Sequence, residues 1–236
     1  SKNPLAINMQ FRQKGKALHL ESDSLQKNIP NISGKIVVLV HGLCMNDRQW
    51  LQTRKDGTKH DHGAALLNDF GYTPIYLHYN TGLNITNNGE QFSTLLEELT
   101  QAWPVAIEEI VIVAHSMGGL VTRSAHYHAG ELAHTWPALT QKIVFLGTPH
   151  HGAVLERGGP WFDTLLDSTR YAAPCAKIGK IRSVGITDLR YGYILDDDDV
   201  PVPLPKKIQC FAIAGTTSTD GDTLHGDGLV QINSAL

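Results

Sequence analysis

Five short apolar runs, each of strand length, constrain what this chain can fold into. They occupy residues 35–40, 73–79, 108–116, 141–149 and 206–216, and the first reads KIVVLV. A continuous run of β-branched residues is typical of a strand that is buried on both faces, as in a parallel sheet. Segments with helical signals lie between the first four runs. This alternation predicts an α/β protein with a mostly parallel, doubly wound sheet.

The segment 87–103 carries the clearest helical pattern. Its large apolar residues recur at the spacing of one helix face, and they are Phe92, Leu95, Leu96, Leu99 and Trp103. Asn87 or Asn88 is available as the N-cap of this helix, and Pro104 would end it. We therefore expect a long amphipathic helix packed on the sheet.

Shorter elements complete the predicted order. Residues 61–71 and 117–130 each have the pattern of a helix that ends at a glycine. The alternating apolar residues of 7–20, with a glycine in the middle, predict an N-terminal hairpin. The polar stretch 21–34 is interpreted as a linker.

One long segment, about 153–205, separates the last two predicted strands. Inserts of this size are often functional lids or caps, and residues 161–168, WFDTLLDS, could form an amphipathic lid helix. The stretch 193–205 contains four consecutive aspartates, which suit a solvated turn or a calcium-binding loop. We interpret residues 1–236 as a single domain that carries this insert.

Composition excludes several classes of function. The chain has 236 residues, a hydrophobic fraction of 42% and a formal net charge of −3, with no long run of lysine or arginine. A nucleic-acid partner is therefore not expected. No apolar stretch reaches the roughly 18 residues of a membrane span, and no signal peptide is visible at the start. Cys44, Cys175 and Cys210 are few and widely spaced, as for thiols in a reducing compartment, which favours the cytoplasm.

The sequence AHSMG, residues 114–118, lies where a predicted strand meets a predicted helix. This is the G-x-S-x-G pattern of a nucleophile elbow, with alanine in the first position. Such a turn is sharp and strained. The residues two positions before and two positions after the serine must therefore be small, so that the strand and the helix can approach each other. The helix start beneath it supplies free N–H groups and a positive dipole end. Ser116 is therefore the candidate nucleophile.

A second turn, His41-Gly42-Leu43, follows the predicted strand 35–40. Acyl transfer needs two backbone N–H groups that point at the developing oxyanion. Met117, directly after the candidate nucleophile, is one candidate donor. Leu43 is the other, because Gly42 would let this backbone approach the substrate. A simple tight turn is the alternative interpretation.

Four motifs follow one another along the chain: VHGL, AHSMGGLV, FLGTPHHG and GDGLV. In this order they resemble the α/β-hydrolase superfamily, and in particular bacterial serine lipases and esterases and the inositol-deacylase-like branch. The resemblance covers about residues 35–236. It implies an α/β-hydrolase fold, and it implies that Asp227, in the GDGLV stretch, is the acid of a catalytic triad.

The third member of that triad, a histidine, is not found in its expected place, because no histidine follows Asp227. In the resembling families a further strand and helix follow this loop, and the histidine lies after the strand. We therefore expect the catalytic histidine beyond Leu236, in a C-terminal strand and helix that this chain lacks. Within this chain, His225, two residues before Asp227, is the alternative candidate for the catalytic base.

The other histidines are interpreted as structural or as parts of the pocket wall. His115 adjoins the candidate nucleophile but points in another direction. His41 belongs to the candidate oxyanion turn, in which the functional group is a backbone N–H. His150 and His151 could line a pocket. The remaining three near the elbow helix are His126, His128 and His134.

No metal ion or cofactor is expected. His60, Asp61 and His62 are close together, but neighbouring ligands in one short loop cannot supply a tetrahedral zinc site alone. Asp61 is interpreted as the N-cap of the following helix.

The predicted function is hydrolysis of carboxylic esters, small or lipid, through an acyl-enzyme on Ser116. An amidase, thioesterase or acyltransferase would use the same groups. A lid over an apolar pocket could also open at a lipid interface. A different class of function, a binding protein of this fold that lacks its base, remains open.

Overall fold

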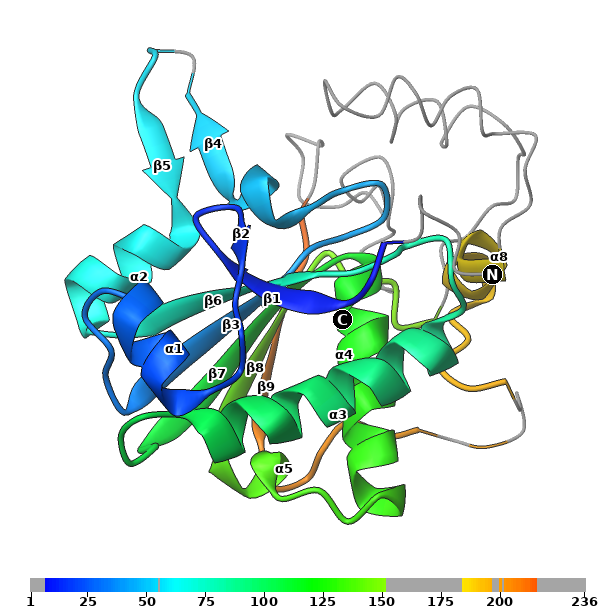
Figure 1. The fold of residues 1–236 in the computed structure, drawn as a ribbon. Helices are drawn as coiled ribbons and strands as arrows, with labels where there is room; N and C mark the ends of the chain where they lie inside the picture. Colours follow the sequence, from blue (N-terminus) through cyan, green and yellow to red (C-terminus); the bar gives the residue numbers. More distant parts are fainter. Residues whose placement is uncertain (1–6, 55, 152–183, 197–199, 201, 216–236) are drawn as a thin grey trace.

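A seven-stranded sheet organises the fold (Figure 1). The structure is a computed structural model that describes residues 7–54, 56–151, 184–196, 200 and 202–215. The strand order is β2-β1-β6-β3-β7-β8-β9. These strands are β1 (Gln10–Gln13), β2 (Lys16–Ala17), β3 (Lys35–Val40), β6 (Thr73–His78), β7 (Glu109–His115), β8 (Thr140–Leu146) and β9 (Gln209–Ile213). The last five run parallel to one another, as the apolar runs predicted.

The N-terminal hairpin extends the sheet on one side. β1 pairs antiparallel with β2 and with β6, and Lys14 and Gly15 turn the chain with positive φ. The prediction of a hairpin is confirmed. The linker expected to follow it is wrong in part, because α1 (Ser22–Asn28) forms there. Leu25 is the one buried residue of α1, so the sequence offered almost no apolar periodicity.

Alternate side chains of β3 enter two separate cores. Ile36, Val38 and Val40 belong to the larger core, whereas Val37 and Leu39 belong to the smaller one on the opposite face. All five are fully buried. This is why the run contains no polar residue: a strand has a period of two, and here both faces are covered.

The larger core lies beneath α1, α3 (Ile85–Ala102) and α4 (Met117–Glu131), the last two of which pack side by side in Figure 1. α2 (His62–Phe70) covers the other face through Leu66, together with Trp50. The predicted α/β layering is confirmed. The close packing of α3 against α4 depends on Gly89, because a methyl group there would collide with Ser124.

The predicted apolar face of α3 is confirmed, but its N-cap is not. Phe92, Leu96 and Leu99 are fully buried. The cap is Asn84, whose side chain accepts the N–H of Asn87 at 3.0 Å. Asn88 is instead a buried residue whose amide donates to the carbonyls of Asn80 and Leu83, so it fixes the loop before the helix.

Five further short elements were not predicted. They are the 3-10 turn η1 (Asp47–Trp50), the hairpin of β4 (Leu51–Thr53) and β5 (Lys59–Asp61), the turn α5 (Trp136–Leu139), and α8 (Val184–Tyr191), which lies in the predicted insert. The hairpin is mostly exposed, and the others are too short for a periodic signal. α4 also passes through Gly130, where the sequence suggested an end, and closes at Leu132.

The topology places a switch point at β3. The chain leaves β3 for β6 on one side and then crosses to β7 on the other. Ligands of open α/β sheets bind at the carboxyl ends of the strands where this reversal occurs. The turns after β3 and β7 meet at that edge. No helix in the described part of the chain is both long and apolar enough to cross a membrane.

Candidate active site

Ser116 occupies a strained turn between β7 and α4. Its φ of 51° and ψ of −123° lie in a region that L-residues rarely adopt. Its N–H donates to the carbonyl of Leu146 at 2.8 Å, which ties the turn to the end of β8. The side chain is partly exposed at the start of α4, where helix N–H groups have no partner within the helix.

Small residues are required around this turn, as the sequence predicted. Ala114 is fully buried. A methyl carbon on Gly118 would lie 2.7 Å from the carbonyl oxygen of His41 and 2.8 Å from that of Val40. These are main-chain atoms at the end of β3, which cannot easily move aside. The elbow and the end of β3 are therefore in direct main-chain contact.

Gly42 brings the second turn against the first. A methyl carbon there would lie 3.1 Å from Cβ of Ser116 and 2.9 Å from Nδ1 of His115. The Gly42 carbonyl accepts the N–H of Met45 at 3.2 Å, which closes a β-turn. Cys44 is the third residue of this turn and has a φ of 56°, as in turns of type II.

The two candidate oxyanion donors flank Ser116 from these two turns. Leu43 lies in the β-turn, and Met117 is the first residue of α4. Both side chains are buried, so only their backbones are available at this edge. Within the described residues, neither N–H donates to a protein acceptor. The structure thus brings together three of the four predicted site residues.

His41 is fixed beneath this turn. Its Nδ1 lies 3.0 Å from the Gly42 carbonyl oxygen, and its ring stacks on Tyr79 with centroids 4.4 Å apart. Tyr79 donates its hydroxyl to the His41 carbonyl at 2.8 Å. Burial lowers the pKa of His41 to about 4, so the ring is neutral at neutral pH.

A buried ion pair lies beside His41. Asp47 is 5% exposed, and its carboxylate accepts from Arg12 at 3.1 Å. Nδ1 of His78 lies 3.3 Å from the same oxygen. Burial alone would raise the pKa of Asp47, but His78 and Arg12 together hold it below its usual value. The pair joins η1 to β1 and β6.

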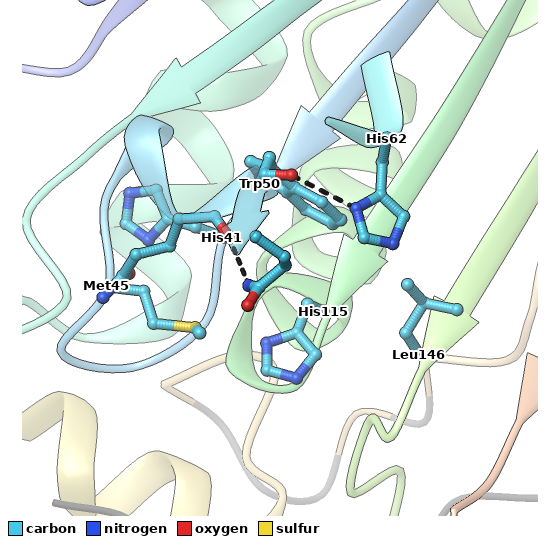
Figure 2. A pocket seen from close by; sticks show the side chains of 8 residues that line it. His41, Met45, Trp50, His62, His115 and Leu146 are labelled. Atoms are coloured by element: carbon cyan, nitrogen blue, oxygen red, sulfur yellow. Dashed lines mark hydrogen bonds between the residues drawn. The ribbon is translucent and has the colours of Figure 1, made fainter. Parts of the chain in front are cut away.

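A hollow of about 150 Å³ opens next to the elbow (Figure 2). Its lining residues are His41, Met45, Gln49, Trp50, Gln52, His62, His115 and Leu146. Figure 2 shows Trp50 and His62 together on one side and His115 on the other. Nδ1 of His62 lies 3.2 Å from the Trp50 carbonyl oxygen. The hollow therefore mixes apolar walls with hydrogen-bonding groups.

Most of these lining residues carry no pattern by which they could be selected from the sequence. Gln49, Trp50 and Gln52 come from η1 and β4, which have no distinctive pattern. A capping box, in which Gln49 accepts the N–H of Asn46 at 2.7 Å, is the one local signal. His115, interpreted from sequence as structural, also borders the hollow.

The histidines after β8 and on α4 have other contacts. The rings of His150 and Phe145 form a T-shaped pair, and Nδ1 of His150 lies 3.2 Å from an Arg123 nitrogen. Burial, helped by Arg123, lowers the pKa of His150 to about 4. His134 bonds with Ser93 at 2.9 Å, and His126 packs against Trp136. His151 is exposed.

The segment around residue 60 behaves as a helix start. Asp61 caps α2 by accepting the N–H of Ala64 at 2.8 Å, which confirms its predicted role. It also accepts the hydroxyl of Tyr76 at 2.6 Å. The rings of His60 and His62 meet edge to face at 4.9 Å. In the described ranges, no three His, Cys, Asp or Glu side chains converge as metal ligands would.

Several predicted features lie outside the described residues. They are Asp227, His225, Cys175, the candidate lid helix 161–168 and three of the four consecutive aspartates. The first of the four, Asp196, is described, and its carboxylate accepts from the Asn84 amide at 2.9 Å. Asp227 as the triad acid, and the lid, stay predictions.

The parallel sheet, the strained serine after β7 and the facing turn after β3 define an α/β-hydrolase fold. The sequence profile of the PGAP1-like alpha/beta domain matches residues 31–217, and the chain belongs to this family. The resemblance drawn from the four sequence motifs is therefore confirmed. No curated protein matches the chain significantly in sequence.

Solved structures agree on the fold. The mature form of the Bacillus licheniformis lipase BlEst2 is 22% identical with a TM-score of 0.58, over 89% of this chain and 82% of that one. The propeptide form of the same lipase is 22% identical with a TM-score of 0.57, over 88% of this chain and 44% of that one. The metagenomic carboxyl esterase MGS0156 is 17% identical with a TM-score of 0.53, over 86% of this chain and 60% of that one. The chain thus spans less than two thirds of the last two.

Proposed function

We propose that this protein is a serine hydrolase that cleaves carboxylic esters through an acyl-enzyme on Ser116. The observation that carries the proposal is the main-chain contact at the elbow. Ser116 is held at a φ of 51°, and Gly42 approaches so closely that a methyl group on it would lie 3.1 Å from Cβ of Ser116. The two turns are therefore in contact, and each carries one candidate oxyanion donor, Leu43 in the first and Met117 in the second.

The chemistry follows from this arrangement. The Ser116 hydroxyl oxygen attacks the ester carbonyl carbon while a base takes the hydroxyl proton. The carbonyl oxygen becomes an oxyanion, which the N–H groups of Leu43 and Met117 stabilise. When the tetrahedral intermediate collapses, the C–O bond to the alcohol breaks and the alcohol leaves with the proton. Water then attacks the acyl-enzyme in the same way and releases the acid.

The first turn of α4 supports the same step. Met117 is its first residue, so its N–H has no partner one turn earlier in the helix. The N-terminal end of a 15-residue helix also carries a partial positive charge, which favours a nearby oxyanion. A serine elsewhere on α4, such as the fully buried Ser124, has neither advantage.

The base is the remaining requirement. Serine is a weak nucleophile at neutral pH unless a histidine accepts its proton, and that histidine is usually oriented by a carboxylate. We assign the carboxylate to Asp227, on the motif resemblance. Among the described histidines, His150 and His134 have partners of their own, and His41 lies beneath the Gly42 turn.

The hollow beside the elbow is the candidate subsite for one side of the ester. Met45, Trp50 and Leu146 supply apolar surface, and the neighbouring glutamines and histidines supply polar groups. Structures named lipase and carboxyl esterase share this fold, which makes ester substrates the first class to test.

Labelling with a fluorophosphonate tests the proposal, because the reagent reacts with activated serines. We expect one label per chain, mapped to Ser116 by peptide mass spectrometry, and loss of p-nitrophenyl ester hydrolysis in Ser116→Ala. Ser124→Ala is the matched control, since it removes a hydroxyl from the same helix and should keep activity. An unlabelled wild-type protein, or hydrolysis that survives Ser116→Ala, would reject the proposal. A p-nitrophenyl series of graded acyl length then defines the acyl preference.

A further inference from the structure

The peptide unit that joins Gly42 to Leu43 contains two groups with opposite roles. Its carbonyl belongs to Gly42, and its N–H is the oxyanion donor proposed for Leu43. The peptide is planar and trans, so the carbonyl and the N–H point in opposite directions. Whatever holds the carbonyl therefore aims the N–H.

Two donors hold that carbonyl. The N–H of Met45 donates to it at 3.2 Å and closes the turn. Nδ1 of His41 lies 3.0 Å from the same oxygen. A carbonyl oxygen has two lone pairs, so both bonds can form together. The Met45 bond comes from the turn itself, whereas the His41 bond comes from a side chain that the turn does not require.

The tautomer of His41 fits this role. The N–H of Tyr79 points to Nε2 at 3.5 Å, which makes Nε2 the acceptor side of the ring. Nδ1 then carries the proton and donates it to the Gly42 carbonyl. The ring itself is immobilised, since it is 1% exposed and stacked on Tyr79.

We propose that His41 is a positioning residue, which holds the Gly42 carbonyl through Nδ1–H and thereby aims the Leu43 N–H at the oxyanion. The inference rests on the proposed function for its catalytic consequence. It separates His41 from the general base: the ring touches the peptide unit and not the substrate. Without this bond, the peptide could rotate and turn its carbonyl toward the developing negative charge.

Two amide variants test the proposal. In His41→Asn, the amide nitrogen can occupy the place of Nδ1 and donate to Gly42. In His41→Gln, the amide reaches the place of Nε2 and leaves the Gly42 carbonyl with Met45 alone. Both are polar, neutral and smaller than histidine, so they form a matched pair. Removing one oxyanion donor costs roughly 100- to 1000-fold in kcat, and a misaimed donor should cost part of that.

We expect His41→Gln to lower kcat by about 10- to 100-fold with KM changed less than about threefold, because the donor acts on the transition state. His41→Asn should recover most of the lost kcat. Circular dichroism and thermal unfolding of both variants check that they fold. Equal kcat in the two variants, or a change confined to KM, would overturn the proposal.

A measurement on the wild-type protein covers the case in which the variants do not fold. NMR of protein labelled with ¹⁵N-histidine should show the His41 proton on Nδ1. A proton on Nε2 would overturn the inference without any substitution. If the wild-type protein folds with the Nδ1–H tautomer but neither hydrolyses esters nor reacts with a fluorophosphonate, the proposed function fails while the His41–Gly42 contact stands.

Discussion

The carbonyl oxygen of Leu146 accepts the backbone N–H of Ser116 at 2.8 Å. Leu146 is the last residue of β8 and Ser116 is the first residue after β7, so the bond continues the pairing of two parallel strands by one step. It anchors the serine just where the backbone turns into its unfavourable conformation. The strain at Ser116 is therefore maintained by the sheet.

Relief of that strain should be measurable. Ser116→Gly and Ser116→Ala both remove the hydroxyl, but only glycine accepts a φ of 51° with a ψ of −123° without cost. Strained conformations of this kind cost about 1–3 kcal/mol. We expect the glycine variant to be the more stable by about that amount in urea unfolding. Equal stabilities would mean that the backbone at Ser116 is not strained in solution.

Gly118 should tolerate no side chain. A methyl group there would press on the carbonyls of Val40 and His41, so Gly118→Ala should lose about 1–3 kcal/mol of folding stability and most of the proposed esterase activity. Gly130→Ala is the control on the same helix, because its methyl would meet no atom within 4 Å. It should gain about 0.5–1 kcal/mol through higher helix propensity. Chemical denaturation of both variants makes the comparison.

The carboxylate of Asp47 should stabilise the fold in a pH-dependent way. Its pKa is lowered in the folded state, so its contribution is complete above the ordinary value of 3.8 and disappears as the pH falls through the folded value. Asp47→Asn should therefore lose about 1–3 kcal/mol at neutral pH. The two proteins should converge in stability in strong acid. A constant difference down to pH 2 would contradict the ion-pair account.

His41 should make the fold sensitive to milder acid. Burial lowers its folded pKa to about 4 from 6.5, so between these values the unfolded chain binds a proton that the folded protein does not. Stability should fall with decreasing pH by up to about 1.4 kcal/mol per unit in this interval. In His41→Asn the slope should be smaller by that amount, whatever its absolute stability. Urea unfolding at pH 7, 6 and 5 measures the slope directly.

Sequence patterns predicted the elements that bury an apolar face. β3 was found because both of its faces are buried, which makes its sequence continuously apolar, and α3 was found because its apolar residues repeat with the period of a helix. α1 and the β4–β5 hairpin were missed because they bury few side chains, so their amino acids carry no periodic signal. The cap of α3 is Asn84 rather than the predicted Asn87 or Asn88, because each of the three asparagines can serve as a cap and the sequence alone does not distinguish them.

The candidate site divides in the same way. The turn at Ser116 was predictable, because its geometry needs small residues at fixed positions. The hollow was not, because Gln49, Trp50 and His62 meet only after β4, β5 and η1 have folded. The hydrogen bond from His41 to Gly42 was also invisible, since it depends on which ring nitrogen faces the carbonyl.

The contact between the turn after β3 and the turn at Ser116 is built from main chain, whereas the adjoining hollow is built from side chains. Gly42 and Gly118 leave no room for change, because each is pressed against atoms of a neighbouring turn or strand. The side chains of Met45, Gln52 and Leu146 line the hollow, whereas Met45 and Leu146 bond to the two turns through their main chains alone. Under the proposed function, we expect substitutions in the second set to change the substrate preference, while the first set keeps the chemistry unchanged.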